Sequence, residues 1–279
     1  MMRLLKGIWR VLSGISRVIT VLAPLVFVAI FVIAFSAGLS DSTPEPLPEK
    51  AALLIAPSGP LVEDAPPVDP VSAFLSQDYD QPTLLNDLVR AIRWAAEDDR
   101  ITALVLDLEN LAGPSTSQTL EISDAMAEFQ AAGKPVIAAG DFYTQAHYLL
   151  ASQADHILLH PEGGMFLEGF SVYRSYLKTF LEKIRVTMHV FRAGESKSAV
   201  EPYLRDDMSE TERRIVTQWL GGLWSTYTQH AEAGRDLPEG EMDRFIADFG
   251  GRLQASNNDL AETILAGGWV DVLADHSEM

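Results

Sequence analysis

The sequence predicts an α/β fold with a mainly parallel sheet, preceded by one transmembrane helix. Short apolar runs, with the composition of strands buried on both faces, alternate with longer segments of helical periodicity. Strands and helices that alternate in this way form parallel βαβ units with right-handed crossovers. A stretch of 20 uncharged residues near the N-terminus predicts the membrane helix.

The N-terminal segment has the pattern of a membrane anchor. Residues 18–37 contain no charge and match the thickness of a bilayer core, which takes about 20 residues. A cleaved signal peptide has a shorter apolar region of roughly 7–15 residues, so an uncleaved anchor is the better interpretation, although the small residues of AFSAG leave cleavage open. Residues 1–17 carry basic residues and no acidic ones, which predicts a cytoplasmic N-terminus and an external domain.

A linker and the first half of the domain follow the anchor. Residues 38–50, GLSDSTPEPLPEK, are rich in proline and polar residues and predict an extended linker. The domain of residues 51–279 begins with the buried strand of AALLI and a proline-rich loop. Residues 83–100 then place apolar side chains at helical spacing, and residues 101–110, ITALVLDLEN, predict the next buried strand.

The alternation continues through the middle of the domain. A second helix is predicted at residues 118–133, ending at Gly133 as helices often do. A strand follows at residues 134–143, then a helix at 144–155 and a strand at 156–163.

The last third is expected to contain three further helices and two strands. We predict a helix over residues 173–184 and a strand over 186–194. Ser209 and Glu212 have the spacing of a capping box at the start of a long helix. Residues 259–275 predict a helix followed by a short edge strand.

Charge and composition exclude several classes of function. The net charge is −18, and removing the four basic residues of the first 17 leaves −22, so nucleic acid is not an expected partner. The chain has no cysteine, which excludes thiolate nucleophiles and cysteine metal sites. It has no glycine-rich phosphate loop, and its six histidines show no metal-binding spacing. No cofactor or metal is expected.

Lysine chemistry is the candidate that remains. The sequence contains no G-x-S-x-G elbow, and the S-x-x-K match of Ser175 and Lys178 lacks its companion motifs, so we interpret it as chance. Lys197 lies between a predicted strand that ends at Gly194 and the helix-start segment SAVEPYLRDD, where Pro202 excludes the middle of a regular helix.

The surroundings of Lys197 have opposing effects on the charge of its amine. A helix start and burial both favour a neutral amine, which can act as a general base. The nearby acidic residues Glu195, Glu201, Asp206 and Asp207 would favour the charged form if they faced the lysine. A solvated surface charge is the alternative interpretation of Lys197.

The segment HVFRAGESKSAVEPYLRDDMSE resembles the corresponding segment of the long-form bacterial signal peptide peptidases, the SppA or protease IV family of S49 serine–lysine peptidases. The likeness extends to LVLDLENLAG, to AAGKPVIAAGDFYTQAHYLLASQADHILLHPEG and to the ending LAGGWVDVLA. It implies two tandem copies of a ClpP/crotonase-like repeated βαβ fold, with a lysine base on the N-terminal copy and a serine nucleophile on the C-terminal copy. By its flanking residues, the family lysine corresponds to Lys197, while Gln145 stands at about the nucleophile position.

The resemblance implies that this chain is the lysine-bearing half of a membrane-anchored serine–lysine endopeptidase. The implied substrates are cleaved signal peptides or other hydrophobic peptides at the bacterial inner membrane, with the catalytic domain in the periplasm. The implied partners are a serine-bearing C-terminal copy and further copies of the chain in a homo-oligomer, a tetramer in the family.

Two other readings stay open. The missing serine favours a non-catalytic scaffold or oligomerisation module at the membrane. An acyl-CoA enzyme of the crotonase type would share the fold class, but the net charge of −22 would repel the phosphates of coenzyme A.

Overall fold

The computed structural model describes residues 22, 24–32, 48–65, 82–191 and 197–279. The chain divides into two units, Met1–Pro48 and Glu49–Met279. In the first unit, residues 24–32 are helical with exposed side chains. No helix among the described residues is long and apolar enough to cross a membrane. Half of the predicted transmembrane segment 18–37 is described, as residues 22 and 24–32, and the other half lies outside the described residues. Residues 1–17 and most of the linker also lie outside them.

A parallel sheet forms the centre of the second unit. Its strand order is β1-β4-β6-β7-β8, and every pair is parallel. The strands are β1 (Ala51–Ile55), β4 (Ile101–Asp107), β6 (Val136–Thr144), β7 (His156–Phe166) and β8 (Val272–Leu273). A smaller sheet contains β2 (Gly59–Val62), β3 (Thr83–Leu84) and β5 (Leu111–Ala112). The prediction of a mainly parallel α/β fold is confirmed.

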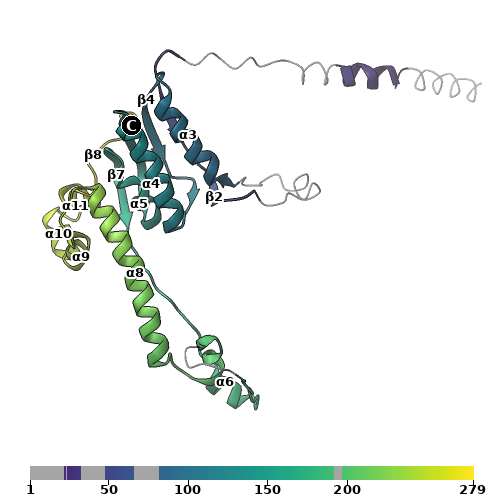
Figure 1. Ribbon diagram of the computed structural model, residues 1–279, viewed down its shortest axis with the longest axis vertical. Helices are drawn as coiled ribbons and strands as arrows, with labels where there is room; N and C mark the ends of the chain where they lie inside the picture. The colour runs from purple at the N-terminus through teal and green to yellow at the C-terminus, as the bar shows by residue number, and fades with distance from the viewer. Residues whose placement is uncertain (1–21, 23, 33–47, 66–81, 192–196) are drawn as a thin grey trace, which may run out of the picture. The chain divides into compact units, whose positions relative to one another are not determined.

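Helices connect the central strands and cover the sheet. The chain runs from β4 through α4 (Thr116–Ala131) to β6, and from β6 through α5 (Gln145–Ala151) to β7. Helix α3 (Leu85–Glu97) precedes β4 and packs beside α4, which in turn contacts α5 (Figure 1). These are the βαβ units that the alternation of the sequence predicts.

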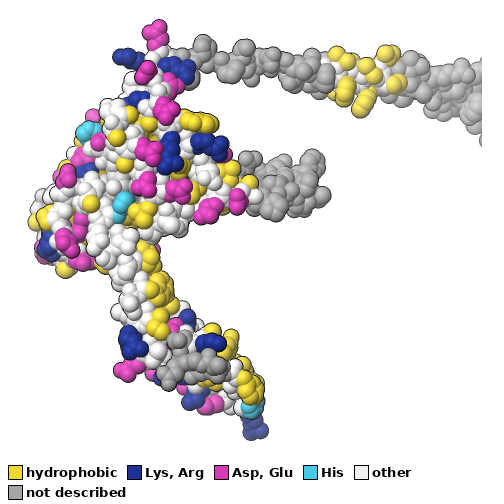
Figure 2. Space-filling model, viewed as in Figure 1, with side chains coloured by type: hydrophobic (Ala, Val, Ile, Leu, Met, Phe, Trp, Pro, Cys, Tyr) yellow, Lys and Arg dark blue, Asp and Glu magenta, His cyan; other side chains and the backbone are white. Residues whose placement is uncertain are grey.

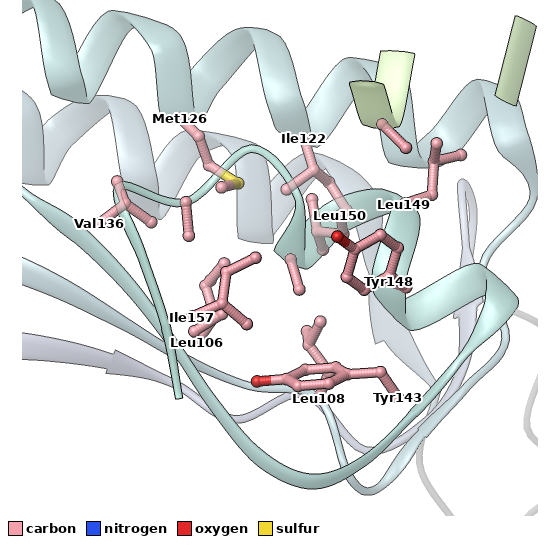
Figure 3. Close-up of a cluster of buried hydrophobic side chains, with 14 of the residues drawn as sticks. Leu106, Leu108, Ile122, Met126, Val136, Tyr143, Tyr148, Leu149, Leu150 and Ile157 are labelled. Atoms are coloured by element: carbon pink, nitrogen blue, oxygen red, sulfur yellow. The ribbon is translucent and has the colours of Figure 1, made fainter. Parts of the chain in front are cut away.

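The core lies between these helices and the sheet. Figure 3 shows Ile122 and Met126 of α4 pointing toward Leu106 and Ile157 of the strands, and all four are essentially inaccessible to solvent. The predicted helix stop at Gly133 is confirmed, since this glycine has a φ of 77°. Close packing of these side chains holds the helices against the sheet and so stabilises the βαβ framework.

Beyond β7 the chain leaves the sheet and forms an extended arm, which we define as residues 167–191 and 197–220 (Figure 1). It contains an irregular stretch, then α6 (Lys178–Lys183), the 3₁₀ helix η1 (Ser198–Val200), α7 (Glu201–Leu204) and the first part of α8 (Glu210–Gly234). The last part of α8 returns to the body, where Tyr227 and Ala231 are buried in the core.

Two sequence predictions in the arm are wrong. The helix expected over 173–184 is limited to α6, and residues 186–191 of the expected strand 186–194 form no strand, while 192–194 lie outside the described residues. A strand needs a neighbour for its backbone hydrogen bonds and an apolar face to bury. Neither is present at these described positions, where nearly all side chains are exposed.

The C-terminal part matches its prediction and adds two helices. Helix α11 (Leu260–Ala266) and the edge strand β8 occur where residues 259–275 predict them. Helices α9 (Glu241–Ala247) and α10 (Phe249–Ala255) were not anticipated. The buried carboxylate of Glu232 accepts hydrogen bonds from the backbone N–H groups of Gly240 (2.9 Å) and Met242 (2.7 Å), which ties the start of α9 to α8.

Candidate functional site

Lys197 lies at the surface of the arm. It is the N-cap residue of η1, and its side chain is exposed. Helix η1 continues into α7, with Pro202 in the first turn, where a proline is tolerated. Lys197 therefore occupies a helix start, as the sequence predicts. The preceding Gly194 and Glu195 lie outside the described residues.

The short segment after Lys197 is hydrogen-bonded to the start of α6 in the arm. The backbone N–H of Leu177 donates to the carbonyl of Pro202 (2.6 Å). The carboxylate of Asp206 accepts from the backbone N–H (2.9 Å) and the hydroxyl (2.8 Å) of Thr179, and these bonds lower the pKa of Asp206. Backbone and side-chain hydrogen bonds thus join α7 to the start of α6.

The N-terminus of α8 departs from the predicted capping box. Ser209 is the N-cap residue, and its hydroxyl accepts from the N–H of Glu212 (3.1 Å), as predicted. The Glu212 carboxylate instead pairs with the Arg174 guanidinium (3.1 Å). The N–H of Ser209 donates to the carboxylate of Glu201 (3.2 Å). Glu201 thus makes the return bond that the sequence assigned to Glu212, because folding brings Arg174 within reach of Glu212.

Three acidic residues near Lys197 have partners elsewhere in the arm. Glu201 and Asp206 accept the hydrogen bonds described above, and the carboxylate of Asp207 pairs with Arg205 (2.8 Å). Each of these three carboxylates therefore has a defined partner within the arm.

Gln145 lies at the start of α5, directly after β6. Its side-chain oxygen accepts from the backbone N–H groups of Glu168 (3.0 Å) and Gly169 (2.7 Å), and its Nε2 donates to the Gly169 carbonyl (3.4 Å). Gly169 has a φ of 70°, a conformation that favours glycine. The carboxamide therefore braces the loop that leads from β7 into the arm.

The structure does not bring Lys197 and Gln145 together. Phe170, next to the loop that Gln145 braces, contacts the ring of Tyr227 on α8. The segment after Lys197 is bonded to Ser209, at the opposite end of α8. At about 1.5 Å rise per residue, the helix from Ser209 to Tyr227 spans roughly 27 Å. The predicted base and the nucleophile position are therefore remote from each other within one chain.

The other chemical candidates have structural roles. Among the described residues no group of histidine and acidic side chains could hold a metal ion. The buried ring of His147 is bonded through Nε2 to the carbonyl of Leu111 (2.8 Å). Lys178 is the first residue of α6 and lies 4.0 Å from Glu182, while Ser175 is outside the helix. The interpretation of Ser175 and Lys178 as a chance match is consistent with this placement.

An apolar cavity of about 240 Å³ was missed in the sequence. It lies between the end of β7 and helices α9, α10 and α11, and its lining residues are all hydrophobic: Met165, Phe166, Leu167, Phe245, Ile246, Phe249 and Ile264. The apolar run MFL, one residue after the predicted strand 156–163, was the available signal in the sequence.

Comparison with known proteins gives one family and several relatives. The model of peptidase family S49 matches residues 128–264. The chain is 34% identical over 280 residues to Protease 4 of Salmonella typhi, covering 98% of this chain and 45% of that protein. It is 37% identical over 252 residues to Protease 4 of Haemophilus influenzae, covering 88% of this chain and 40% of that protein. The chain thus spans less than half the length of these relatives.

Solved structures resemble the chain more distantly. The structure of Pseudomonas aeruginosa DspI covers 70% of this chain and 64% of its own, with 15% identity and a TM-score of 0.27. An enoyl-CoA hydratase/isomerase family member covers 66% of this chain and 76% of its own, with 16% identity and a TM-score of 0.27.

Proposed function

Residues 128–264 belong to peptidase family S49, and on this premise we propose that the chain is the lysine-bearing half of a membrane-anchored serine–lysine peptidase. Lys197 is the proposed general base, and the serine nucleophile belongs to a second copy of a ClpP/crotonase-like fold. The similarity to Protease 4 over 98% of the chain supports the assignment to a peptidase.

One observation carries the division of roles. Lys197 is exposed at the end of an arm, roughly 27 Å along α8 from the region of Gln145. Gln145 has no nucleophilic oxygen, and its carboxamide is already bonded to the loop at Gly169. An exposed lysine in this position is available to a serine on a second copy of the fold, and that availability supports the division of roles.

In the proposed reaction the neutral amine of Lys197 accepts the proton of a serine hydroxyl on the second copy. The serine oxygen then attacks the carbonyl carbon of the peptide bond, and the lysine ammonium returns the proton to the leaving amine. Water hydrolyses the resulting ester by the same proton route. The role of this chain is to hold the amine at a fixed position, neutral and within reach of that hydroxyl.

A second candidate function is a non-catalytic scaffold or oligomerisation module at the membrane. The exposed apolar surface of the arm favours it (Figure 2). Phe191 is 99% and Tyr173 92% exposed, an unusual state for large apolar side chains in a monomer. The same surface suits contact with a serine-bearing copy or with further copies of the chain, a tetramer by family resemblance, so it supports an assembly under either function.

The proposed substrates are hydrophobic peptides, including cleaved signal peptides, and the proposed location is the periplasmic face of the bacterial inner membrane. The four basic residues within segment 1–17 and the uncharged segment 18–37 support this topology. Alkaline phosphatase fused after Lys50 should be active in cells. An abundant but inactive fusion would contradict the external location.

The test of the function uses the chain joined to a serine-bearing copy from the same family. Lys197→Ala and Lys197→Arg should both abolish cleavage of a hydrophobic peptide while folding and assembly are retained, since arginine does not give up its proton near neutral pH. Lys178→Ala is the control and should cleave at the wild-type rate. A Lys197→Ala protein with most of its activity would return Lys197 to a solvated surface charge.

An assay of the chain without a serine-bearing copy tests whether the chain contains an active site of its own. The chain should neither cleave the peptide nor react with serine-directed phosphonates. Stoichiometric labelling of a serine would mean that this chain contains its own nucleophile. Cleavage that appears only after joining a serine-bearing copy supports the peptidase, and its absence in every joined form supports the scaffold.

A further inference from the structure

Two buried carboxylates lie close to the segment that carries Lys197, one at the start of α7 and one in the first turn of α8. Glu201 and Glu212 are each 6% exposed, in an arm whose other described acidic residues are exposed. Burying a carboxylate is costly unless it is hydrogen-bonded or paired. Glu212 meets this requirement through Arg174, and Glu201 through the backbone N–H of Ser209.

The bond from Ser209 to Glu201 joins the lysine segment to a rigid element. Ser209 is the N-cap of the 25-residue helix α8, whose other end is buried in the body. Glu201 is the first residue of α7, four positions after Lys197, and η1 fills the positions between them. The positive end of the α8 dipole also favours a carboxylate at this place.

The other ties of this segment act further from the lysine. Leu177 bonds to Pro202, and Thr179 bonds to Asp206, so both hold the part of the chain after Glu201. The Glu201 bond fixes the junction of η1 and α7, on the side nearest to Lys197.

We propose that Glu201 is a positioning residue for Lys197: its buried carboxylate clips the turn of Lys197 to the N-terminus of α8 and so fixes where the amine is presented. This inference rests on the proposed function of Lys197 as a base. It concerns a hydrogen bond, so the acceptor oxygen is required and the negative charge is secondary.

The test compares Glu201→Ala, which removes the acceptor, with Glu201→Gln, which keeps an acceptor oxygen without the charge. Glu210→Ala is the matched control, since Glu210 is an exposed carboxylate in the first turn of α8, whose N-cap residue Ser209 bonds to Glu201. Hydrogen exchange is measured on the full chain in detergent, at the Ser209 amide and in peptides covering residues 197–204. Cleavage is measured on the chain joined to a serine-bearing copy.

In Glu201→Ala the Ser209 amide should exchange roughly 10- to 100-fold faster, because a hydrogen bond to a charged acceptor is lost. Peptides 197–204 should lose protection while those of the body do not. In the joined protein, kcat should fall about 10- to 100-fold with KM within about threefold, since a small misplacement of a catalytic group has this size of effect. Glu201→Gln should recover most of both properties, and Glu210→Ala should match the wild type.

Two results would overturn the inference. One is a Glu201→Ala protein with wild-type exchange at Ser209 and in residues 197–204. The other is a folded Glu201→Gln protein as impaired as Glu201→Ala, since a hydrogen-bond clip tolerates the amide; this variant decides the question if Glu201→Ala fails to fold. The hydrogen-exchange results test the Glu201–Ser209 bond independently of whether Lys197 is a general base. Faster exchange together with an active Lys197→Ala enzyme would contradict the base while leaving the clip intact.

Discussion

The body and the arm of the second unit are stabilised in different ways. In the body, Phe129 of α4 is fully buried with the rest of the core. In the arm, Phe180 of α6 is 56% exposed and α6 contains no buried residue. The arm instead keeps its shape through polar ties, such as Arg174 with Glu212 and Thr179 with Asp206.

The buried core and the candidate catalytic lysine therefore lie in separate regions of the molecule. The body buries a large apolar core, whereas the arm carries the candidate base and leaves apolar side chains exposed. Lys197 is therefore positioned by hydrogen bonds, which are sensitive to single substitutions, and not by core packing.

The largest expected effect comes from the same substitution made in both regions. Phe129→Ala should lower the free energy of unfolding by about 3–5 kcal/mol, because it leaves a cavity in the core. Phe180→Ala should change it by less than about 0.5 kcal/mol, as exposed sites usually do. Urea denaturation followed by circular dichroism measures both. Equal losses would mean that the arm has a core of its own and that the contrast is wrong.

A smaller effect is expected from the polar ties. Arg174→Ala leaves the buried carboxylate of Glu212 without its partner and should cost about 1–3 kcal/mol, seen as faster amide exchange at the start of α8. Lys178→Ala removes an exposed pair with Glu182 at 4.0 Å and should cost less than about 0.5 kcal/mol. If both variants exchanged alike, the arm would not depend on its buried carboxylate.

The smallest effect is a pH dependence confined to the arm. Hydrogen bonds from Thr179 lower the pKa of Asp206, so its stabilising contribution is present above the ordinary value of 3.8 and is lost as the pH falls through the lowered value. Protection of the Thr179 amide, corrected for intrinsic exchange, should decrease over that window while that of the core strands is unchanged. Asp206→Asn should remove the pH dependence, and its persistence in that variant would assign it to another group.

Much of the body could be predicted from the sequence because its signals are local. The apolar run ITALVLD predicts β4, and Gly133 marks the end of α4 through its backbone freedom. The lysine segment could also be singled out, through its helix-start residues and its family likeness. In the arm the same local rules were wrong for residues 186–191, since no strand lies there among the described residues.

The sequence by itself determined the parallel α/β framework and the position of Lys197 at a helix start, because periodicity, glycine and proline act within a few residues of chain. Only the tertiary structure decided which carboxylate accepts the hydrogen bond from the backbone N–H of Ser209. Glu212 is paired with Arg174, and Glu201 is the acceptor. The tertiary structure also showed that the Gln145 carboxamide is hydrogen-bonded to the loop at Gly169. This loop lies next to Phe170, which contacts Tyr227 of α8, far from the end of α8 near the lysine. Hydrogen bonds between remote segments depend on where folding places them, and no local pattern records that.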